Sequence, residues 1–269
     1  MKQKMIKRPE ALARLLAHRD KDLVKIITGV RRCGKSSLML LYAKALREEG
    51  VPESHLHHMN MESLTQHSFL DYLSFYEHVK ELLALPGRHY LMVDEIQAVS
   101  QWERAIESFR LDFDVDITIT GSNAYLLSSE LSTLLSGRYV EIRLLPLSFR
   151  EFLDFHEFPQ AITVEEKFQK YLQIGGMPVL SQFDLNLPGI FEALEGIYAT
   201  VILRDVLEHN NISDQALLKK IVAFLSGNIG SINSPNSIGK VLAQEGALEE
   251  NGKILSIRGR GSTLHLIYE

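Results

Sequence analysis

The sequence predicts an α/β protein in which a parallel sheet flanked by helices is followed by a smaller helical domain. Three observations predict this fold class. Short apolar stretches alternate with helix-like stretches through the first 145 residues, which is typical of parallel βαβ units with helices on both faces. A glycine-rich pattern stands between the first strand and the helix that follows it. Beyond Pro146 only helical spacing remains.

Composition limits the class of protein further. The chain has 269 residues, 45 % of them apolar and 23 % charged, so it can bury a sizeable core. A net charge of −5 argues against a generally basic nucleic-acid coat, and a single Cys excludes a disulfide framework. The longest apolar run, residues 38–43, is far shorter than the ~20 residues that cross a bilayer. We expect a cytoplasmic protein with no membrane partner.

Periodicity justifies each element of the first half. Apolar runs predict five strands, the second of them weak, at residues 24–28, 56–60, 89–93, 115–120 and 139–145. Apolar residues spaced three and four apart predict helices over residues 36–48, 69–76 and 102–109. Gly50 and Pro52 end the first of these helices, and Pro86 with Gly87 ends the second.

The second half is predicted to be helical. Helices are expected over residues 191–209 and 215–225, and the run Gly175 to Pro178 interrupts the helical spacing. Ser234 followed by Pro235 is an N-cap with Pro at the first helical position, so a short helix should begin there. We place the domain change near residues 146–160, which gives domains over residues 1–150 and 151–269.

The glycine-rich pattern over residues 29–36 is the phosphate loop G-x-x-x-x-G-K-[ST]. Its glycines allow backbone angles at which successive N–H groups converge on phosphates at a helix N-terminus. Lys35 supplies a compact positive charge for the β- and γ-phosphates, and the Ser36 hydroxyl is a hard oxygen ligand for Mg²⁺. The predicted nucleotide-binding residues are Gly29, Val30, Arg31, Arg32, Cys33, Gly34, Lys35, Ser36 and Ser37. The alternative is a glycine-rich turn before a helix.

Two carboxylates follow the third strand. Asp94 and Glu95 end an apolar run, which is the Walker B arrangement. Successive strand side chains point to opposite sides, so the two acids cannot share one role. Asp94 suits the Mg²⁺ shell, and Glu95 suits orienting or deprotonating the attacking water. The alternative is a solvated turn.

Polar residues also end the fourth strand and begin the fifth. The stretch from Thr118 to Asn123 places a polar side chain where it can hold the water or the γ-phosphate, or simply cap the next helix. Arg138 is a candidate to supply positive charge to a developing transition state, in its own or in a neighbouring subunit. An exposed surface arginine is the alternative.

Further motifs accompany the phosphate loop. They are D-E-I-Q with W-E at residues 94–103, G-S-N at 121–123, S-G-R-Y-V at 136–140, P-L-S-F-R-E-F at 146–152 and G-G-M-P at 175–178. Together with the loop they resemble the prokaryotic AAA-type ATPases of the AAA_14 family with a C-terminal DUF4143 region. The resemblance extends over about residues 8–240.

The resemblance implies an AAA+-like P-loop NTPase sheet in the order 5-1-4-3-2, and ATP with Mg²⁺ as the bound group. It suggests Asn123, or Ser122, as a sensor on the fourth strand and Arg138 as an arginine finger. It also suggests Asn60 as a polar partner of the catalytic Glu. Residues 176–178 resemble an element that reads the nucleotide from the second domain, which adds Pro178 to the site.

The end of the chain departs from the family. Residues 215–244 resemble the first helices of a winged helix-turn-helix, whereas residues 253–269 predict a short β-hairpin around Arg258 to Gly261. The family would place a helix able to enter a DNA groove there. We therefore expect a C-terminally truncated or frame-shifted member, and DNA binding is in question.

The predicted function is a Mg-dependent ATPase that hydrolyses ATP to ADP and phosphate as a molecular switch or motor. The alternative is a nucleotide-gated DNA- or protein-binding regulatory module with little turnover. A small-molecule kinase is disfavoured because Glu95 stands beside Asp94. DNA, a protein partner and a second copy of the chain all stay open as partners.

Overall fold

The computed structural model describes residues 7–121, 135, 137–183, 185, 187–201, 215–244, 254–257 and 265–268. The chain divides into two compact units, Met1–Val201 and Ile202–Glu269. The finer division at residue 150 stays a prediction.

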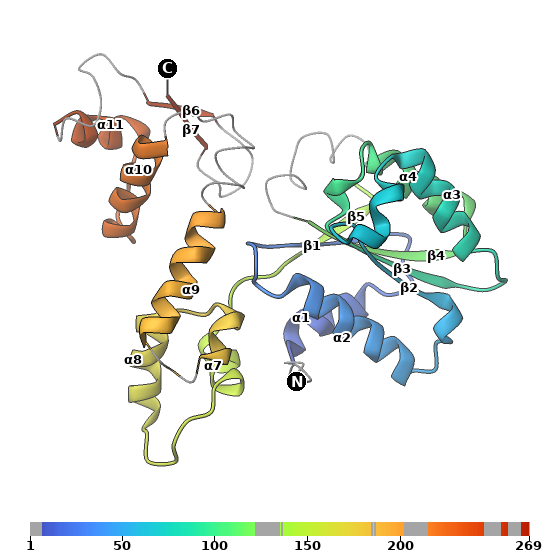
Figure 1. Ribbon diagram of the computed structural model, residues 1–269, viewed down its shortest axis with the longest axis horizontal. Coiled ribbons are helices and arrows are strands. Elements are labelled where there is room, and N and C mark those ends of the chain that lie inside the picture. The colour runs from blue at the N-terminus through green and yellow to red at the C-terminus, as the bar shows by residue number, and fades with distance from the viewer. Residues whose placement is uncertain are drawn as a thin grey trace. The chain divides into compact units, whose positions relative to one another are not determined.

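A five-stranded parallel sheet forms the centre of the first unit (Figure 1). Its strands are β1 Val24–Thr28, β2 Leu56–Asn60, β3 His89–Asp94, β4 Val115–Thr120 and β5 Tyr139–Arg143. They lie in the order β2-β3-β4-β1-β5, and every neighbouring pair is parallel. The predicted fold class and strand order are confirmed. All parallel strands therefore present their carboxyl ends, and the polar residues found there, at one edge of the sheet.

Helices cover both faces of this sheet (Figure 1). The helices are α1 Pro9–Ala17 and α2 Lys35–Glu48 on one face, and α3 Tyr72–Leu82 and α4 Trp102–Asp112 on the other. Side chains of β3 alternate between the two cores: Leu91 and Val93 pack with α3 and α4, and Met92 packs with α2. Burial on both faces explains the apolar centre of β3, residues 90–93.

The helix α1 is absent from the sequence prediction. Its local signals are Pro9 at the first helical position and Leu15 buried against the α2 side of the sheet. Ala11, Leu12, Leu15 and Leu16 have helical spacing and face one core, but nine residues are too few for a stable helix alone, so packing on α2 stabilises it.

A third core follows the sheet within the first unit. It is built by α7 Phe149–Phe155, α8 Val164–Ile174, the 3₁₀ turn Pro178–Gln182 and α9 Leu187–Thr200. Both α7 and α8 begin with a capping box, Ser148 with Glu151 and Thr163 with Glu166, which satisfies backbone donors that a helix N-terminus otherwise leaves unpaired.

The second unit contains α10 Gln215–Gly227, α11 Pro235–Gln244 and an antiparallel pair, β6 Ile254–Ile257 with β7 His265–Tyr268. The predicted helix start at Pro235 and the two strands of the predicted hairpin are confirmed. Its turn lies outside the described residues. Among the described residues of both units, no helix has the length and apolar content needed to cross a membrane.

Candidate functional site

The phosphate loop joins β1 to α2 at the carboxyl edge of the sheet. Gly29 and Gly34 have φ of +154° and +101°, angles that side-chain-bearing residues rarely adopt. A Cβ on Gly29 would lie 2.3 Å from the Leu144 carbonyl oxygen and 2.8 Å from Cys33 Sγ. Only glycine fits at Gly29, because the loop passes directly over the end of β5.

Lys35 opens helix α2 and turns back across the loop. Its side chain is only 5 % exposed. Its Nζ donates to the Gly29 carbonyl oxygen at 3.1 Å and lies 3.9 Å from Glu95 Oε1. Ser36 and Ser37 are exposed in the first helical turn, where backbone N–H groups have no intrahelical acceptor. The loop, the ammonium group and the helix N-terminus therefore concentrate positive potential at one place.

Asp94 ends β3 and is tied to the neighbouring strand. Its Oδ1 accepts a hydrogen bond from the Thr120 hydroxyl at the end of β4, and the Thr120 oxygen in turn accepts from the Glu95 N–H at 3.1 Å. Asp94 is 1 % exposed, and its Oδ2 has no hydrogen-bond donor among the described residues.

A buried carboxylate oxygen without a donor is costly, by roughly 1–3 kcal/mol or more for a charged group. It is also the kind of hard ligand that Mg²⁺ takes. The donor set of Asp94 Oδ2 and the Ser36 hydroxyl therefore fits the predicted magnesium ion.

Glu95 has different surroundings, in agreement with the alternation argument. Its φ is +54°, and its side chain is 13 % exposed. Gln97 Nε2 donates to Glu95 Oε2 at 2.5 Å, whereas Oε1 is the oxygen on the Lys35 side. Sequence reasoning missed Gln97, although its position two residues after a strand-end Glu was a usable signal.

Asn60 is in register with Asp94 across β2 and β3. Its side-chain oxygen accepts from the Glu62 N–H at 2.9 Å and closes a turn after β2. The contact with Glu95 that the resemblance suggested for Asn60 is made by Gln97.

Arg138 lies at the opposite edge of the sheet. It precedes β5, and its carbonyl oxygen accepts from the N–H of Val24, the first residue of β1. The whole length of β1, at about 3.3 Å per residue, separates it from the phosphate loop. Its side chain is 53 % exposed and lies 3.9 Å from Glu107 on α4. Contact between Arg138 and a phosphate in the loop of the same chain is therefore excluded.

The run from Gly176 to Pro178 is held beside the loop. The Gly176 carbonyl accepts from the Leu147 N–H at 2.7 Å, and a Cβ on Gly176 would lie 2.3 Å from the Leu147 oxygen. Pro178 Cγ lies 4.0 Å from the position of a Cβ built on Gly34. The structure thus brings Pro178 to the phosphate loop, whereas Asn123 and Ser122 lie outside the described residues.

Arg8 is a further residue that sequence reasoning missed. Its side chain is 9 % exposed, and its Nε lies 2.7 Å from Glu151 Oε1 on α7. Its two terminal nitrogens donate to Cys33 O, in the phosphate loop, at 3.4 Å and to Leu145 O at 2.7 Å. One buried guanidinium therefore connects the loop, the end of β5 and α7.

Cys33 is completely buried within the loop. Burial raises the pKa of its thiol, so the neutral form is favoured. This agrees with a small packing side chain at a variable position of the loop.

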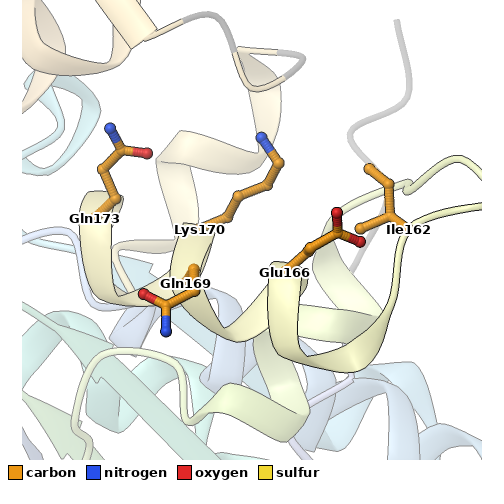
Figure 2. Close-up of a pocket in the computed structure, with 5 residues that line it drawn as sticks. All are labelled: Ile162, Glu166, Gln169, Lys170 and Gln173. Carbon is orange, nitrogen blue, oxygen red and sulfur yellow. The ribbon is translucent and has the colours of Figure 1, made fainter.

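A hollow of about 450 Å³ lies elsewhere, along α8 (Figure 2). Four of its five lining residues come from that single helix, and Ile162 precedes it. One of the four, Glu166, is already engaged in the capping box with Thr163. Ligand sites gather polar groups from several elements, so this hollow does not compete with the phosphate loop.

Comparisons with known families agree with this geometry. Residues 21–153 match the AAA domain family AAA_14, and residues 165–250 match a domain of unknown function, DUF8612. The first match confirms the AAA_14 resemblance. The second match corrects the expected C-terminal region: the resemblance implied DUF4143, whereas the residues match DUF8612.

Two relatives match most of the chain. An uncharacterized protein of Haemophilus influenzae is 36 % identical over 247 residues, which cover 91 % of this chain and 61 % of that protein. An uncharacterized protein of Methanocaldococcus jannaschii is 31 % identical over 225 residues, covering 78 % of this chain and 48 % of that protein. The chain thus spans about three fifths and about half of these relatives.

A solved structure shares the fold. The Walker-type ATPase of Pyrococcus abyssi has a TM-score of 0.53 and 15 % identity, with 89 % of both chains covered. At this identity the likeness concerns the fold alone. The phosphate loop, Asp94 and Glu95 all lie inside the matched AAA domain.

Proposed function

We propose that this chain, an AAA-type P-loop NTPase by its domain and fold, binds ATP with Mg²⁺ and hydrolyses it to ADP and phosphate as a molecular switch or motor. One observation supports this above the others. At one edge of the sheet the phosphate-loop lysine lies 3.9 Å from a strand-end carboxylate, Glu95, and beside it Asp94 keeps a buried carboxylate oxygen without a donor.

Each residue has a role in this proposal. The loop N–H groups and Lys35 bind the phosphates, and Ser36 with Asp94 holds Mg²⁺, which neutralises charge on the β- and γ-phosphates. The attacking water forms a bond to the γ-phosphorus, the bond to ADP breaks, and Glu95 accepts the proton of the water. Asn123 is proposed to hold the γ-phosphate or the water, and Pro178 to complete the nucleotide site.

Arg138 is proposed to act from a neighbouring copy of the chain. Its distance from the loop of its own chain supports action in trans, and its exposure leaves it accessible to a second subunit. A guanidinium placed on the γ-phosphate stabilises the charge of the transition state. The active form in this proposal is a homo-oligomer.

The regulatory alternative has one observation in its favour. The phosphate loop is connected to α7 through Arg8 and adjoins Pro178, so its occupancy can influence the helices after the sheet. In that case the output is binding of DNA or a protein partner with little turnover.

Two variants test the assignment. Lys35→Ala should weaken binding of ATP·Mg²⁺ at least about 100-fold in calorimetry, because the phosphates lose their nearest ammonium group. Lys44→Ala is the matched control, since Lys44 is exposed on the same helix. Glu95→Gln should bind ATP as the wild type does and turn over at least about 100-fold more slowly. Equal affinity in Lys35→Ala, or unchanged turnover in Glu95→Gln, contradicts the proposal.

A further inference from the structure

Gln97 is the side chain in direct contact with the proposed general base. It lies in the 3₁₀ turn Ile96–Ala98 that follows β3, and its Nε2 donates to Glu95 Oε2 at 2.5 Å. Ile96 and Val99 on either side of it are buried in the core under α3 and α4. The turn is therefore anchored, and the amide of Gln97 is presented to Glu95 by a fixed piece of backbone.

The orientation of this amide follows from the carboxylate. A carboxylate only accepts hydrogen bonds, so the amide must turn its NH₂ group toward Glu95. The consequence is that Gln97 Oε1 is buried without a hydrogen-bond partner among the described residues. A protein normally pairs such an atom, which indicates that the bond to Glu95 determines how this side chain is placed.

The bond makes the two oxygens of Glu95 unequal. Oε2 is held by Gln97, whereas Oε1 lies 3.9 Å from Lys35 Nζ, on the side of the phosphate loop. The main chain of Glu95 is fixed as well, because its N–H donates to Thr120 Oγ1. The hydrogen bond from Gln97 thus restrains rotation of the Glu95 carboxylate about the Cγ–Cδ bond.

We infer that Gln97 is a positioning residue, which holds Glu95 Oε2 so that Oε1 faces the water that attacks the γ-phosphate. The inference rests on the proposed ATP hydrolysis. The proton of the water passes to Glu95 Oε1, and Gln97 neither gives nor takes a proton. Among the described contacts, Glu95 receives its amide donor from Gln97 and none from Asn60 Nδ2, and Asn60 Oδ1 accepts from the Glu62 N–H.

Two substitutions test this role at saturating ATP. Gln97→Glu keeps the size of the side chain and replaces the donor with a second carboxylate, and Gln97→Leu removes the polar group. Both should lower kcat at least about 10-fold, as expected when a general base is misdirected, while the Kd for ATP·Mg²⁺ stays within about two-fold. Gln101→Glu is the matched control, because Gln101 is exposed shortly after the same turn, and it should retain the wild-type kcat.

The Glu95→Gln background separates positioning from folding. If Gln97 acts through Glu95, adding Gln97→Leu to Glu95→Gln should change the residual kcat by less than about two-fold, although the single Gln97→Leu change is damaging. An equally large further loss in the double variant overturns the inference.

Other outcomes are equally decisive. Wild-type hydrolysis that depends on Glu95 but is unchanged in both Gln97 variants overturns the inference and leaves the proposed function standing. A loss confined to melting temperature and ATP affinity, with kcat unchanged, also overturns it. No hydrolysis by the wild-type protein overturns the proposed function itself, and the inference with it.

Discussion

Single residues at the phosphate site act through bonds that cross between strands. Thr120 on β4 holds Asp94 on β3 and also accepts from the Glu95 N–H. The Asp94 carboxylate is thus bonded by Thr120, whereas the Glu95 carboxylate is bonded by Gln97, although the two residues are adjacent in the chain. The assignment of Asp94 to the metal and Glu95 to the water rests on this difference.

A histidine stack at the other end of β3 predicts a dependence of stability on pH. His57 Nε2 lies 2.9 Å from His89 Nδ1. Burial, followed by the charges of His89 and His55, lowers the pKa of His57 from 6.5 to about 4. Between these two values the unfolded chain binds a proton that the folded chain does not. The free energy of unfolding should therefore fall as pH decreases through this window.

Urea unfolding at pH 7.5 and pH 5 measures this effect. His57→Gln should reduce the difference in unfolding free energy between the two pH values by about 1–2 kcal/mol. His67→Gln, at an exposed histidine of the 3₁₀ turn Leu64–Phe69, serves as the control. The same pH dependence in His57→Gln and wild type would show that His57 does not titrate in this way.

At the scale of elements, strand positions were predictable because buried parallel strands leave a clear apolar signal. The strand at residues 56–60 was also predicted, although its signal is weak. Only two of its residues, Leu56 and Met59, are buried, so its apolar pattern is incomplete. Helix α1 was missed although its leucines have helical spacing, because a run of only nine residues is too short to be expected as a helix without a packing partner.

The same reasoning applies to the site. Lys35, Asp94 and Glu95 were found from sequence since the motif is local. The contacts of Arg8 with Leu145 and of Thr120 with Asp94 join residues far apart in the chain. The strand order placed β4 beside β3, but which side chains bond also depends on strand register and side-chain orientation, which the sequence pattern does not specify.

The connection between the loop and α7 leads to a prediction on stability. Arg8→Met removes a buried guanidinium and leaves Glu151 and two carbonyl oxygens without it. We expect the free energy of unfolding to fall by about 2–4 kcal/mol, as for other broken buried ion pairs. Arg14→Met, at an exposed bond to the Glu141 carbonyl, should cost less than about 0.5 kcal/mol. Chemical denaturation measures both, and equal losses would refute a special role for Arg8.

At the scale of the whole molecule, the two parts of the proposed ATPase site lie at opposite edges of the sheet. The phosphate loop lies at the carboxyl edge, and Arg138 lies at the amino edge of the same strands. A single chain therefore holds both parts but cannot bring them together, and the proposed ATPase needs a second copy.

Mixing two impaired variants tests this requirement. Arg138→Ala should lower kcat by about 100-fold or more through loss of transition-state charge, and Glu95→Gln should also turn over at least about 100-fold more slowly on its own. In an equimolar mixture, Arg138→Ala supplies Glu95 and Glu95→Gln supplies the arginine, so about a quarter of random contacts are complete. The control mixes Arg138→Ala with a chain that carries both Arg138→Ala and Glu95→Gln. Neither copy then supplies the arginine, so this mixture should show no recovery. Absence of recovery in the first mixture would refute action in trans.

The proposed action of Arg138 in trans also limits the geometry of assembly, because Arg138 precedes β5 at the amino edge of the sheet. The amino edge of one sheet then meets the carboxyl edge of another, either reciprocally in a two-fold dimer or head to tail in a heterologous contact. Head-to-tail contacts close into a ring or continue as an open filament. In an open filament, one terminal copy has a nucleotide site that no arginine reaches. The rate per chain should therefore rise with the length of an open filament, whereas a two-fold dimer or a closed ring leaves every site complete.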